Sequence, residues 1–359
     1  MFNKTLLGSA VLAAMMATSA NAAIPLAGDA VQVYGQATGA IMVDSHKTKD
    51  SAMNVDVESR IGFRGVVEFD SLSPNLVWQI EGGNANGAAG AFGVRDTFVG
   101  LDFESVGSIK WGRQLVAAYN YVDWPHSNPG LGNVFDWNND LGVAYQDRAS
   151  NTIRFDSVSM GGLGIQATIG GMENTTDSLV ASIAANYNGD GYSVHGGYYS
   201  RGEYTVKGTV DKPLIADPTD PTSLIPNPDY GKDTTTPYYA SSYAIIGGNV
   251  ALGDVTLTAA YKHMMADTQT GDSTQGAFSA TAQYVNNGTW LYKAGFAMTT
   301  DAEIDGKDKK ESGDMALTAR VGYLLPSAII YSDIRHYDMN GNLEGDDMTR
   351  FMLGIEYYF

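Results

Sequence analysis

The chain ends in TRFMLGIEYYF (residues 349–359), and this stretch decides the fold. Apolar side chains occupy every second position, namely Phe351, Leu353, Ile355, Tyr357 and Phe359. Successive side chains of a β-strand point to opposite faces, so the alternation predicts a strand with one apolar side. The other side would carry Arg350 and Glu356.

The same alternation recurs along the rest of the chain. At 57–69, for example, Ile61 and Phe63 fall on one face, and Arg60 and Arg64 fall on the other. We count sixteen candidate strands, which lie near residues 31–43, 57–69, 75–82, 93–103, 106–113, 147–158, 163–171, 178–188, 191–203, 238–251, 254–264, 275–286, 289–300, 313–325, 327–338 and 348–359. Two of them, 238–251 and 327–338, show mixed parity.

The connections between these strands are alternately short and long. The short set is 70–74, 104–107, 159–162, 188–191, 252–254, 286–288 and 325–327, and the long set is 44–56, 83–92, 114–146, 172–177, 204–237, 265–274, 301–312 and 339–347. Transmembrane barrels have short periplasmic turns and long external loops, and an even number of strands removes unpaired sheet edges. We therefore predict an all-β protein, a sixteen-stranded antiparallel transmembrane β-barrel.

The first 22 residues have the pattern of a secretory signal peptide. Lys4 precedes an apolar run at 6–16, and Ala20-Asn21-Ala22 forms a small-x-small cleavage signal. We expect residues 23–359 to form the barrel domain. No later apolar run approaches the length of a membrane-spanning helix, which excludes helical spans.

Charge and composition exclude several kinds of partner. The formal net charge is −18, and removal of Lys4 with the leader would make it −19. Nucleic-acid binding requires clustered Lys and Arg, so no nucleic-acid partner is expected. The chain has no cysteine and depends on no disulfide. We expect no metal site and no cofactor.

Several motifs, taken in order along the chain, are similar to one known family. They are VYGQATG at 33–39, SRIGFRG at 59–65, TFVGLDFESVGSIKWGRQ at 97–114 and the terminal IEYYF, which resembles the assembly signal of outer-membrane barrels. The chain thus resembles a sixteen-stranded trimeric porin of Gram-negative bacteria over essentially its whole mature length. The resemblance implies an outer-membrane channel for small hydrophilic solutes, a homotrimer, and contact with membrane lipid and lipopolysaccharide.

In that family the third external loop folds into the barrel and narrows the pore. The third long connection here is 114–146, so the resemblance makes it the constriction loop. It carries two Asp-Trp pairs, Asp123-Trp124 and Asp136-Trp137, followed by Asp140. The resemblance implies that Asp123, Asp136 and Asp140 form the acidic side of the constriction.

The resemblance also implies a ladder of arginines on the facing wall. By position the candidates are Arg60, Arg95, Arg113 and Arg148. Parity places Arg60 opposite the apolar face, but it places Arg95 with Val99 in strand 93–103, so a bulge would be needed to turn Arg95 inward. Opposed rows of charge would create a transverse field that favours small polar solutes. Each charge could instead be a solvated surface group.

The Asp-Trp pairs further suggest a sugar channel. Pyranose faces pack on aromatic rings, while their hydroxyls and acetamides bond to carboxylates and amides. This arrangement resembles that of the chitoporins, which pass chito-oligosaccharides. The resemblance implies a binding set of Asp123, Trp124, Asp136 and Trp137, with Arg95 and Arg148 as hydrogen-bond donors. For Trp124, a purely structural role in anchoring the loop stays open.

Three further segments carry expectations. Residues 23–30 could plug the pore, although a disordered or interface-packed terminus is the simpler expectation. The insertion 204–237, rich in proline and aspartate, is predicted to be an external loop without regular structure. By position, loop 83–92 could fold onto a neighbouring subunit, as the second loop does in the family.

No catalytic motif is present. The sequence has no GxSxG, HExxH or GxxxxGK[ST], and Ser193 and His195, although on one strand, have nothing to make them reactive. We therefore expect no enzyme. The alternatives to a sugar channel are a barrel hydrolase, an adhesion barrel with a blocked lumen, and a non-specific diffusion porin with a mild cation preference.

Overall fold

The computed structural model describes residues 23–83, 91–122, 134–137, 140–171, 175–209, 211–216, 223–268, 271–341 and 347–359. For residues 72, 136, 137 and 216 it describes only the backbone. The predicted signal peptide, residues 1–22, lies outside the described residues, and so do Asp123 and Trp124.

Sixteen antiparallel strands form the wall. They are β2 (Val31–His46), β4 (Arg60–Phe69), β5 (Leu72–Gly83), β6 (Thr97–Phe103), β7 (Gly107–Leu115), β8 (Arg148–Ser157), β9 (Leu163–Gly170), β10 (Val180–Asn188), β11 (Tyr192–Arg201), β16 (Ser241–Leu252), β17 (Val255–Asp267), β18 (Asp272–Asn286), β19 (Trp290–Thr299), β22 (Met315–Leu325), β23 (Ala328–Asp338) and β24 (Met348–Tyr358). Each pairs with the next, and β24 pairs back with β2 from Gln36↔Tyr358 to His46↔Met348. The sheet is therefore closed, which confirms the predicted sixteen-stranded barrel.

The two faces of the wall differ as the alternation predicts. On β22, Leu317 and Val321 are 47% and 44% exposed, whereas Thr318 and Arg320 between them are 8% and 7% exposed. The exposed set is apolar and suits contact with lipid, and the other set faces the barrel interior. This division follows from the period of two in the sequence.

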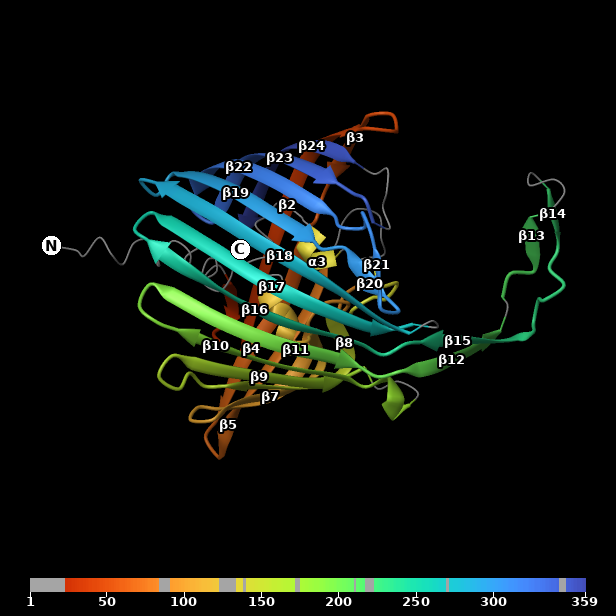
Figure 1. Ribbon diagram of the computed structural model, residues 1–359. Coiled ribbons are helices and arrows are strands. Elements are labelled where there is room, and N and C mark those ends of the chain that lie inside the picture. The colour runs from red at the N-terminus through yellow and green to blue at the C-terminus, as the bar shows by residue number, and fades with distance from the viewer. Residues whose placement is uncertain are drawn as a thin grey trace.

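Short turns join the strands at one end of the barrel, and long segments join them at the other (Figure 1). The turn between β18 and β19 is an example: Asn287 and Gly288 have φ of 50° and 68°, and the Thr289 N–H donates to the Asn286 carbonyl at 3.0 Å. Left-handed residues at both central positions match the twist of a hairpin. The predicted alternation of connections is confirmed.

The external connections contain further short strands. They are β3 (Ala52–Asp56), β12 (Tyr204–Thr209), β13 (Leu214–Ala216), β14 (Leu224–Pro226), β15 (Asp233–Tyr238), β20 (Ala302–Ile304) and β21 (Lys307–Lys309). β12 and β15 pair in a two-stranded ribbon that projects from the barrel, and β13 and β14 pair near its far end (Figure 1). The prediction that 204–237 lacks regular structure is wrong. Its threonines and other β-branched residues favour strands, and β12 pairs with β15 and β13 with β14.

The N-terminal tail adds to the sheet. β1 (Ile24–Ala27) pairs with β2 through Ile24↔Val33 and Pro25↔Gln32. At the same end, Gly35 and Phe359 exchange backbone hydrogen bonds of 2.6 and 3.1 Å. Residues 24–27 therefore extend the sheet beside the C-terminus and do not plug the pore.

Helical structure in the described residues is confined to short segments. These are η1 (Ala117–Tyr119), α2 (Asn120–Val122), α3 (Val134–Trp137) and η3 (Thr176–Ser178). Within the part of the chain that is described, no helix is long and apolar enough to cross a membrane. The main buried apolar cluster joins η1, α2 and α3 to inward-facing side chains such as Tyr199, Tyr243 and Met264. The core thus lies inside the barrel, between the third loop and the wall.

Candidate functional site

The third external loop enters the barrel directly after β7. The Ala117 N–H donates to Thr168 Oγ1 on β9 at 3.1 Å, and the Ala118 N–H donates to Ser182 Oγ on β10 at 2.9 Å. A Cβ atom at Gly197 on β11 would lie 2.8 Å from the Ala118 Cβ, so glycine leaves the room that η1 needs. Small and hydroxylic residues on the inner wall therefore seat the loop backbone.

The middle of the loop is anchored by α3. Val134 and Phe135 are fully buried, and α3 contacts β18 and β19. Lys262 of β17 donates its ammonium to the Phe135 carbonyl and lies 5.0 Å from the centre of the Phe135 ring. A buried ammonium requires such partners. Positions 136 and 137 are thereby brought into the barrel interior.

Asp140 is held against the wall beyond α3. Its N–H donates to Gln275 Oε1 at 2.9 Å, and its carboxylate accepts from Gln275 Nε2 at 3.3 Å and from Lys309 Nζ at 3.0 Å. The Asp140 side chain is fully buried. The structure thus uses this carboxylate to tie the loop to β18 and β21.

The loop returns to β8 across a tyrosine cluster. The Tyr145 hydroxyl donates to the Met265 carbonyl at 3.2 Å, and its ring meets those of Tyr199 and Tyr243 edge-on. Burial raises the pKa of the Tyr145 phenol above its ordinary value, so the group stays a neutral donor. The whole described loop therefore crosses the interior from β9–β11 to β16–β19, which confirms the predicted inward-folded third loop.

The predicted arginine ladder lies along the external ends of β4 to β8. Arg60 is half-buried and pairs in register with Gln36 and Gly83. Arg113 is opposite Thr97, and Arg148 is opposite Leu115. The structure therefore places Arg60, Arg113 and Arg148 on neighbouring strands along one side of the barrel.

Arg95 is placed differently from the prediction. β6 begins at Thr97, so Arg95 precedes the strand, and the predicted strand start at 93 is wrong. Strand parity does not apply there, and no bulge is required to orient the side chain. Arg95 forms an ion pair with Glu81, which also accepts a hydrogen bond from the Tyr34 hydroxyl at 2.8 Å.

The other ladder residues also have partners. Arg148 pairs with Asp96 at 2.5 Å. Arg113 donates from Nε to the Val94 carbonyl at 2.7 Å and from Nη1 to Ser150 Oγ at 2.8 Å. Arg95 and Arg148 are thus paired charges, and Arg113 bonds to uncharged acceptors, so these residues offer both donors and acceptors to a passing solute.

Sequence reasoning missed a second charged wall on β22 to β24. Arg320 binds Asp333 through two hydrogen bonds of 2.7 and 2.8 Å, and Arg335 binds the same carboxylate at 2.9 Å. Arg320 also lies 3.8 Å from Glu356 and from the centre of the Tyr331 ring. Strand parity could have found Arg320 and Glu356, but the mixed parity of 327–338 concealed Asp333.

A third group lies on β7 and β8, where Lys110 and Arg154 both pair with Asp156 at 2.9 and 2.8 Å. These walls give the interior a polar lining of matched charges. Within the described residues, no cluster of three His, Cys, Asp or Glu side chains could hold a metal ion. The geometry suits passage of hydrophilic solutes through a narrowed interior.

Known proteins match the chain in sequence and in fold. A family model described as Gram-negative porin matches residues 8–342. The chitoporin of Vibrio furnissii is 31% identical over 385 aligned residues, which cover 100% of this chain and 99% of that protein.

Solved porin structures resemble the fold at low sequence identity. An anion-selective porin from Comamonas acidovorans has a TM-score of 0.70 at 16% identity, over 92% of this chain and 99% of its own. OmpT of Vibrio cholerae in a trimer form gives 0.66 at 16%, over 92% and 99%. OmpF of Salmonella typhi, in complex with daunomycin, gives 0.66 at 18%, over 94% and 100%.

The family match spans most of the chain. It agrees with the closed barrel, the polar interior and the inward-folded loop. Together these features indicate a channel rather than an enzyme. The chain belongs to the Gram-negative porin family and is a channel-forming barrel of the outer membrane.

Proposed function

We propose that this porin binds chito-oligosaccharides as they pass through its channel. The observation that carries the proposal is the full-length similarity to a chitoporin, at 31% identity. The seating of α3 adds support, because the buried Val134 and Phe135 hold positions 136 and 137 inside the barrel. Asp136 and Trp137 are therefore available, in the proposal, to a sugar in the passage.

The chemistry of the sugar fits the residue types. N-acetylglucosamine presents C–H-rich faces to aromatic rings and presents hydroxyl and acetamide groups to carboxylates. The proposed set is Asp123, Trp124, Asp136 and Trp137, with Arg95 and Arg148 as donors. The side chains of Arg95 and Arg148 remain 27% and 16% exposed despite their ion pairs, which leaves N–H groups for a solute.

Ion current through single channels in planar bilayers tests the proposal. Chitohexaose is expected to block the current transiently, and Trp137→Ala is expected to shorten the blocked intervals. Trp111→Ala is the matched control, because Trp111 lies on β7 with its ring exposed on the lipid side. The control should open normally and bind chitohexaose as the unaltered channel does.

Maltose provides the comparison sugar. If chitohexaose and maltose affect the current alike, or if neither affects it, the sugar-specific proposal fails. The chain would then act as a non-specific diffusion porin, with the mild cation preference that a net charge of −18 favours.

We propose in addition that the protein is a homotrimer in contact with outer-membrane lipid and lipopolysaccharide. One structural relative of low identity is described in a trimer form, and the exposed apolar faces of the strands fit lipid or a neighbouring barrel. Current steps that occur in threes would support the trimer. Steps of one uniform size that never group in threes would contradict it.

A further inference from the structure

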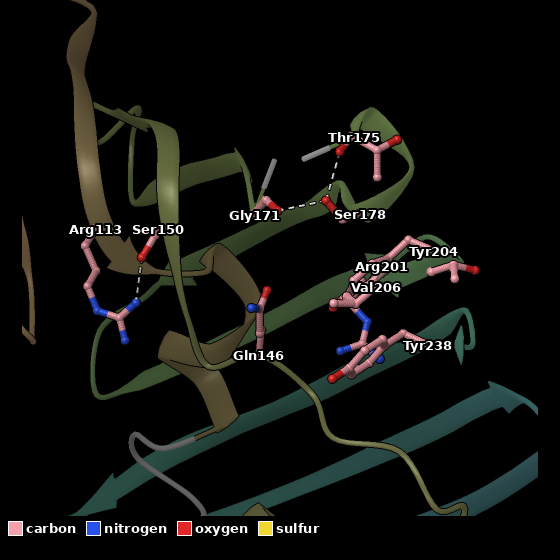
Figure 2. A pocket seen from close by; sticks show the side chains of 11 residues that line it. Arg113, Gln146, Ser150, Gly171, Thr175, Ser178, Arg201, Tyr204, Val206 and Tyr238 are labelled. Carbon is pink, nitrogen blue, oxygen red and sulfur yellow. Dashed lines mark hydrogen bonds between the residues drawn. The ribbon is translucent and has the colours of Figure 1, made fainter. Parts of the chain in front are cut away.

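A pocket lies at the external end of the barrel, where the return of the third loop at Gln146 meets the base of the β12–β15 ribbon. It has a volume of about 270 Å³, near the lower end of the range for small-molecule sites. It is lined by Arg113, Gln146, Ser150, Gly171, Thr175, Ser178, Arg201, Tyr204, Thr205, Val206 and Tyr238. Figure 2 shows Arg113 and Ser150 on one side, Arg201 with Tyr204 and Tyr238 on the other, and Gln146 between them. We call it the rim pocket.

Arg201 is the buried cation of the rim pocket. It is 8% exposed, and it donates from Nη1 to the Ala144 carbonyl at 3.2 Å and from Nη2 to the Tyr239 carbonyl at 3.5 Å. Among the described residues, its Nε atom is buried and has no acceptor. A buried guanidinium N–H without an acceptor is costly, so the site favours a ligand that supplies one.

The Gln146 side chain lacks a donor rather than an acceptor among the described residues. Its backbone N–H donates a hydrogen bond to the Tyr199 hydroxyl oxygen at 3.1 Å. Its side-chain Oε1 is buried and, within the described part of the chain, has no donor. The rim pocket therefore lacks both an acceptor beside Arg201 and a donor beside Gln146. A ligand with an anionic group and hydroxyl groups would satisfy both.

Within the described residues, neither arginine of the rim pocket forms an ion pair. Arg95, Arg148, Arg154, Arg320, Arg335 and Arg350 all form ion pairs with carboxylates. Arg113 and Arg201 form none with any described residue, although the chain carries 40 acidic residues. Two guanidinium groups without carboxylates favour an incoming oxyanion, which they can bind through paired hydrogen bonds.

An aromatic surface completes the rim pocket. Tyr204 and Tyr238 are register partners at the base of the β12–β15 ribbon, and their rings stack at 4.8 Å with an angle of 4°. The Arg201 guanidinium lies 5.9 Å from the centre of the Tyr204 ring. A pocket lined by both aromatic rings and hydroxyl groups, here those of Ser150 and Thr175, is typical of contacts with a sugar ring.

We propose that the rim pocket binds a phosphate-bearing sugar, with the phosphate on Arg113 and Arg201 and the ring against Tyr204 and Tyr238. Such a group can come from a free sugar phosphate or from the phosphorylated saccharide of lipopolysaccharide. The proposal goes beyond the channel function, because Arg95 and Arg148, the donors proposed for a sugar in the channel, do not line the rim pocket.

Titration calorimetry on the intact protein in detergent tests the proposal. Glucose 6-phosphate is expected to bind, and glucose and inorganic phosphate are each expected to bind at least about tenfold more weakly, since each supplies half of the contacts. Arg113→Gln should weaken binding of glucose 6-phosphate by about tenfold, the effect of losing a charge-assisted contact. Equal affinity for glucose 6-phosphate and inorganic phosphate would overturn the sugar part of the proposal.

Lys207→Gln is the matched control. It changes the net charge by the same amount as Arg113→Gln, and Lys207, on the ribbon beside the rim pocket, is exposed and does not line the pocket. It should bind glucose 6-phosphate as the unaltered protein does. An equal loss in Arg113→Gln and Lys207→Gln would show a general charge effect and overturn the proposal.

A second variant avoids dependence on Arg201, whose removal could disturb the fold. Tyr238→Ala removes one face of the aromatic surface, and it should weaken glucose 6-phosphate more than inorganic phosphate. Each variant is accepted as folded if it shows the mobility shift between folded and unfolded protein on gels. The block by chitohexaose is measured separately, so failure of the rim pocket and failure of the sugar channel are distinguishable.

The source of the ligand is resolved by competition. If lipopolysaccharide in mixed micelles displaces glucose 6-phosphate, and Arg113→Gln weakens both, the rim pocket takes the phosphosugar from either source. If lipopolysaccharide binds at the rim pocket and glucose 6-phosphate does not, the ligand is the phosphorylated saccharide of lipopolysaccharide, and a free sugar phosphate is excluded. If neither binds, the proposal is overturned.

Discussion

Asp44 and Arg350 are direct register partners at the seam where the first and last strands of the barrel meet, and their side chains form two hydrogen bonds of 2.6 and 2.8 Å. The Asp44 side chain is almost completely buried. The seam therefore has a charged bond across it in addition to its backbone ladder. The pair fixes which residue of β2 faces which residue of β24.

Removal of one partner should weaken the seam. Arg350→Met leaves the Asp44 carboxylate buried without its cation, and the expected loss is about 1–3 kcal/mol of stability. The mobility shift between folded and unfolded protein on gels, followed against temperature, measures the loss. Lys47→Gln is the control, since the Lys47–Asp347 pair is highly exposed on the lysine side and should matter little. Similar losses in both variants would contradict the role given to the seam.

Gly35 should be required for seating the C-terminal residue. A Cβ atom there would lie 2.5 Å from Phe359 Cζ and 2.6 Å from the Arg60 carbonyl oxygen, whereas one at Gly39 on the same strand would meet nothing closer than 4.0 Å. Gly35→Ala is therefore expected to lower the yield of folded barrel several-fold, and Gly39→Ala is expected to leave it near normal. The fraction of heat-modifiable protein in the outer membrane measures both. Equal yields would refute the steric argument.

The Asp140–Lys309 contact should hold the third loop in place. Lys309→Gln removes a charged partner of a buried carboxylate and should weaken the attachment by about 1–3 kcal/mol. Single-channel current is then expected to become larger and noisier. Lys307→Gln is the matched control, because Lys307 is exposed on the same short strand. Unchanged current in Lys309→Gln would contradict the anchoring role.

Acid should loosen one link at the external mouth. The hydrogen bond from Lys47 holds the pKa of Asp347 below its ordinary value, and Asp347 also accepts from the Met339 N–H at 2.8 Å. For a carboxyl whose pKa is lower in the folded state, the stabilisation is present above the ordinary value of about 4. It is lost as the pH falls through the folded value. The protection of the Met339 amide, measured against its intrinsic exchange rate at each pH, should therefore fall in acid.

Asp347→Asn should remove that pH dependence. The asparagine oxygen can still accept from Met339, but it does not titrate in this range. Protection that still falls in acid in the variant would assign the effect to another group.

The wall could be predicted from sequence because its lipid face imposes a period of two. The two strands of mixed parity show where the period fails. Tyr243 and Ile245 of β16 are apolar yet face inward, because the third loop packs on them. Ile329 and Tyr331 of β23 also face inward, in a small cluster with Leu291. Apolar residues inside the barrel are a tertiary effect that local alternation does not contain.

The candidate site could be predicted only in part. Position along the chain was enough to place Arg113 and Arg148 at the mouth. It did not reveal that Arg95 precedes its strand or that Asp140 is buried against Lys309. Ion-pair partners more than 100 positions apart leave no local signal, because closure of the sheet brings them together.

The seam also has a consequence for biogenesis. Asp44 and Arg350 are 306 positions apart, and contacts between such distant positions close large loops and form slowly. Until β24 is delivered, β2 has a free hydrogen-bonding edge, which invites pairing with other chains. A chain that stops before residue 348 would therefore be an open sheet with two reactive edges rather than a weaker pore. Protection of the nascent protein must last until the eleven residues of β24 are in place.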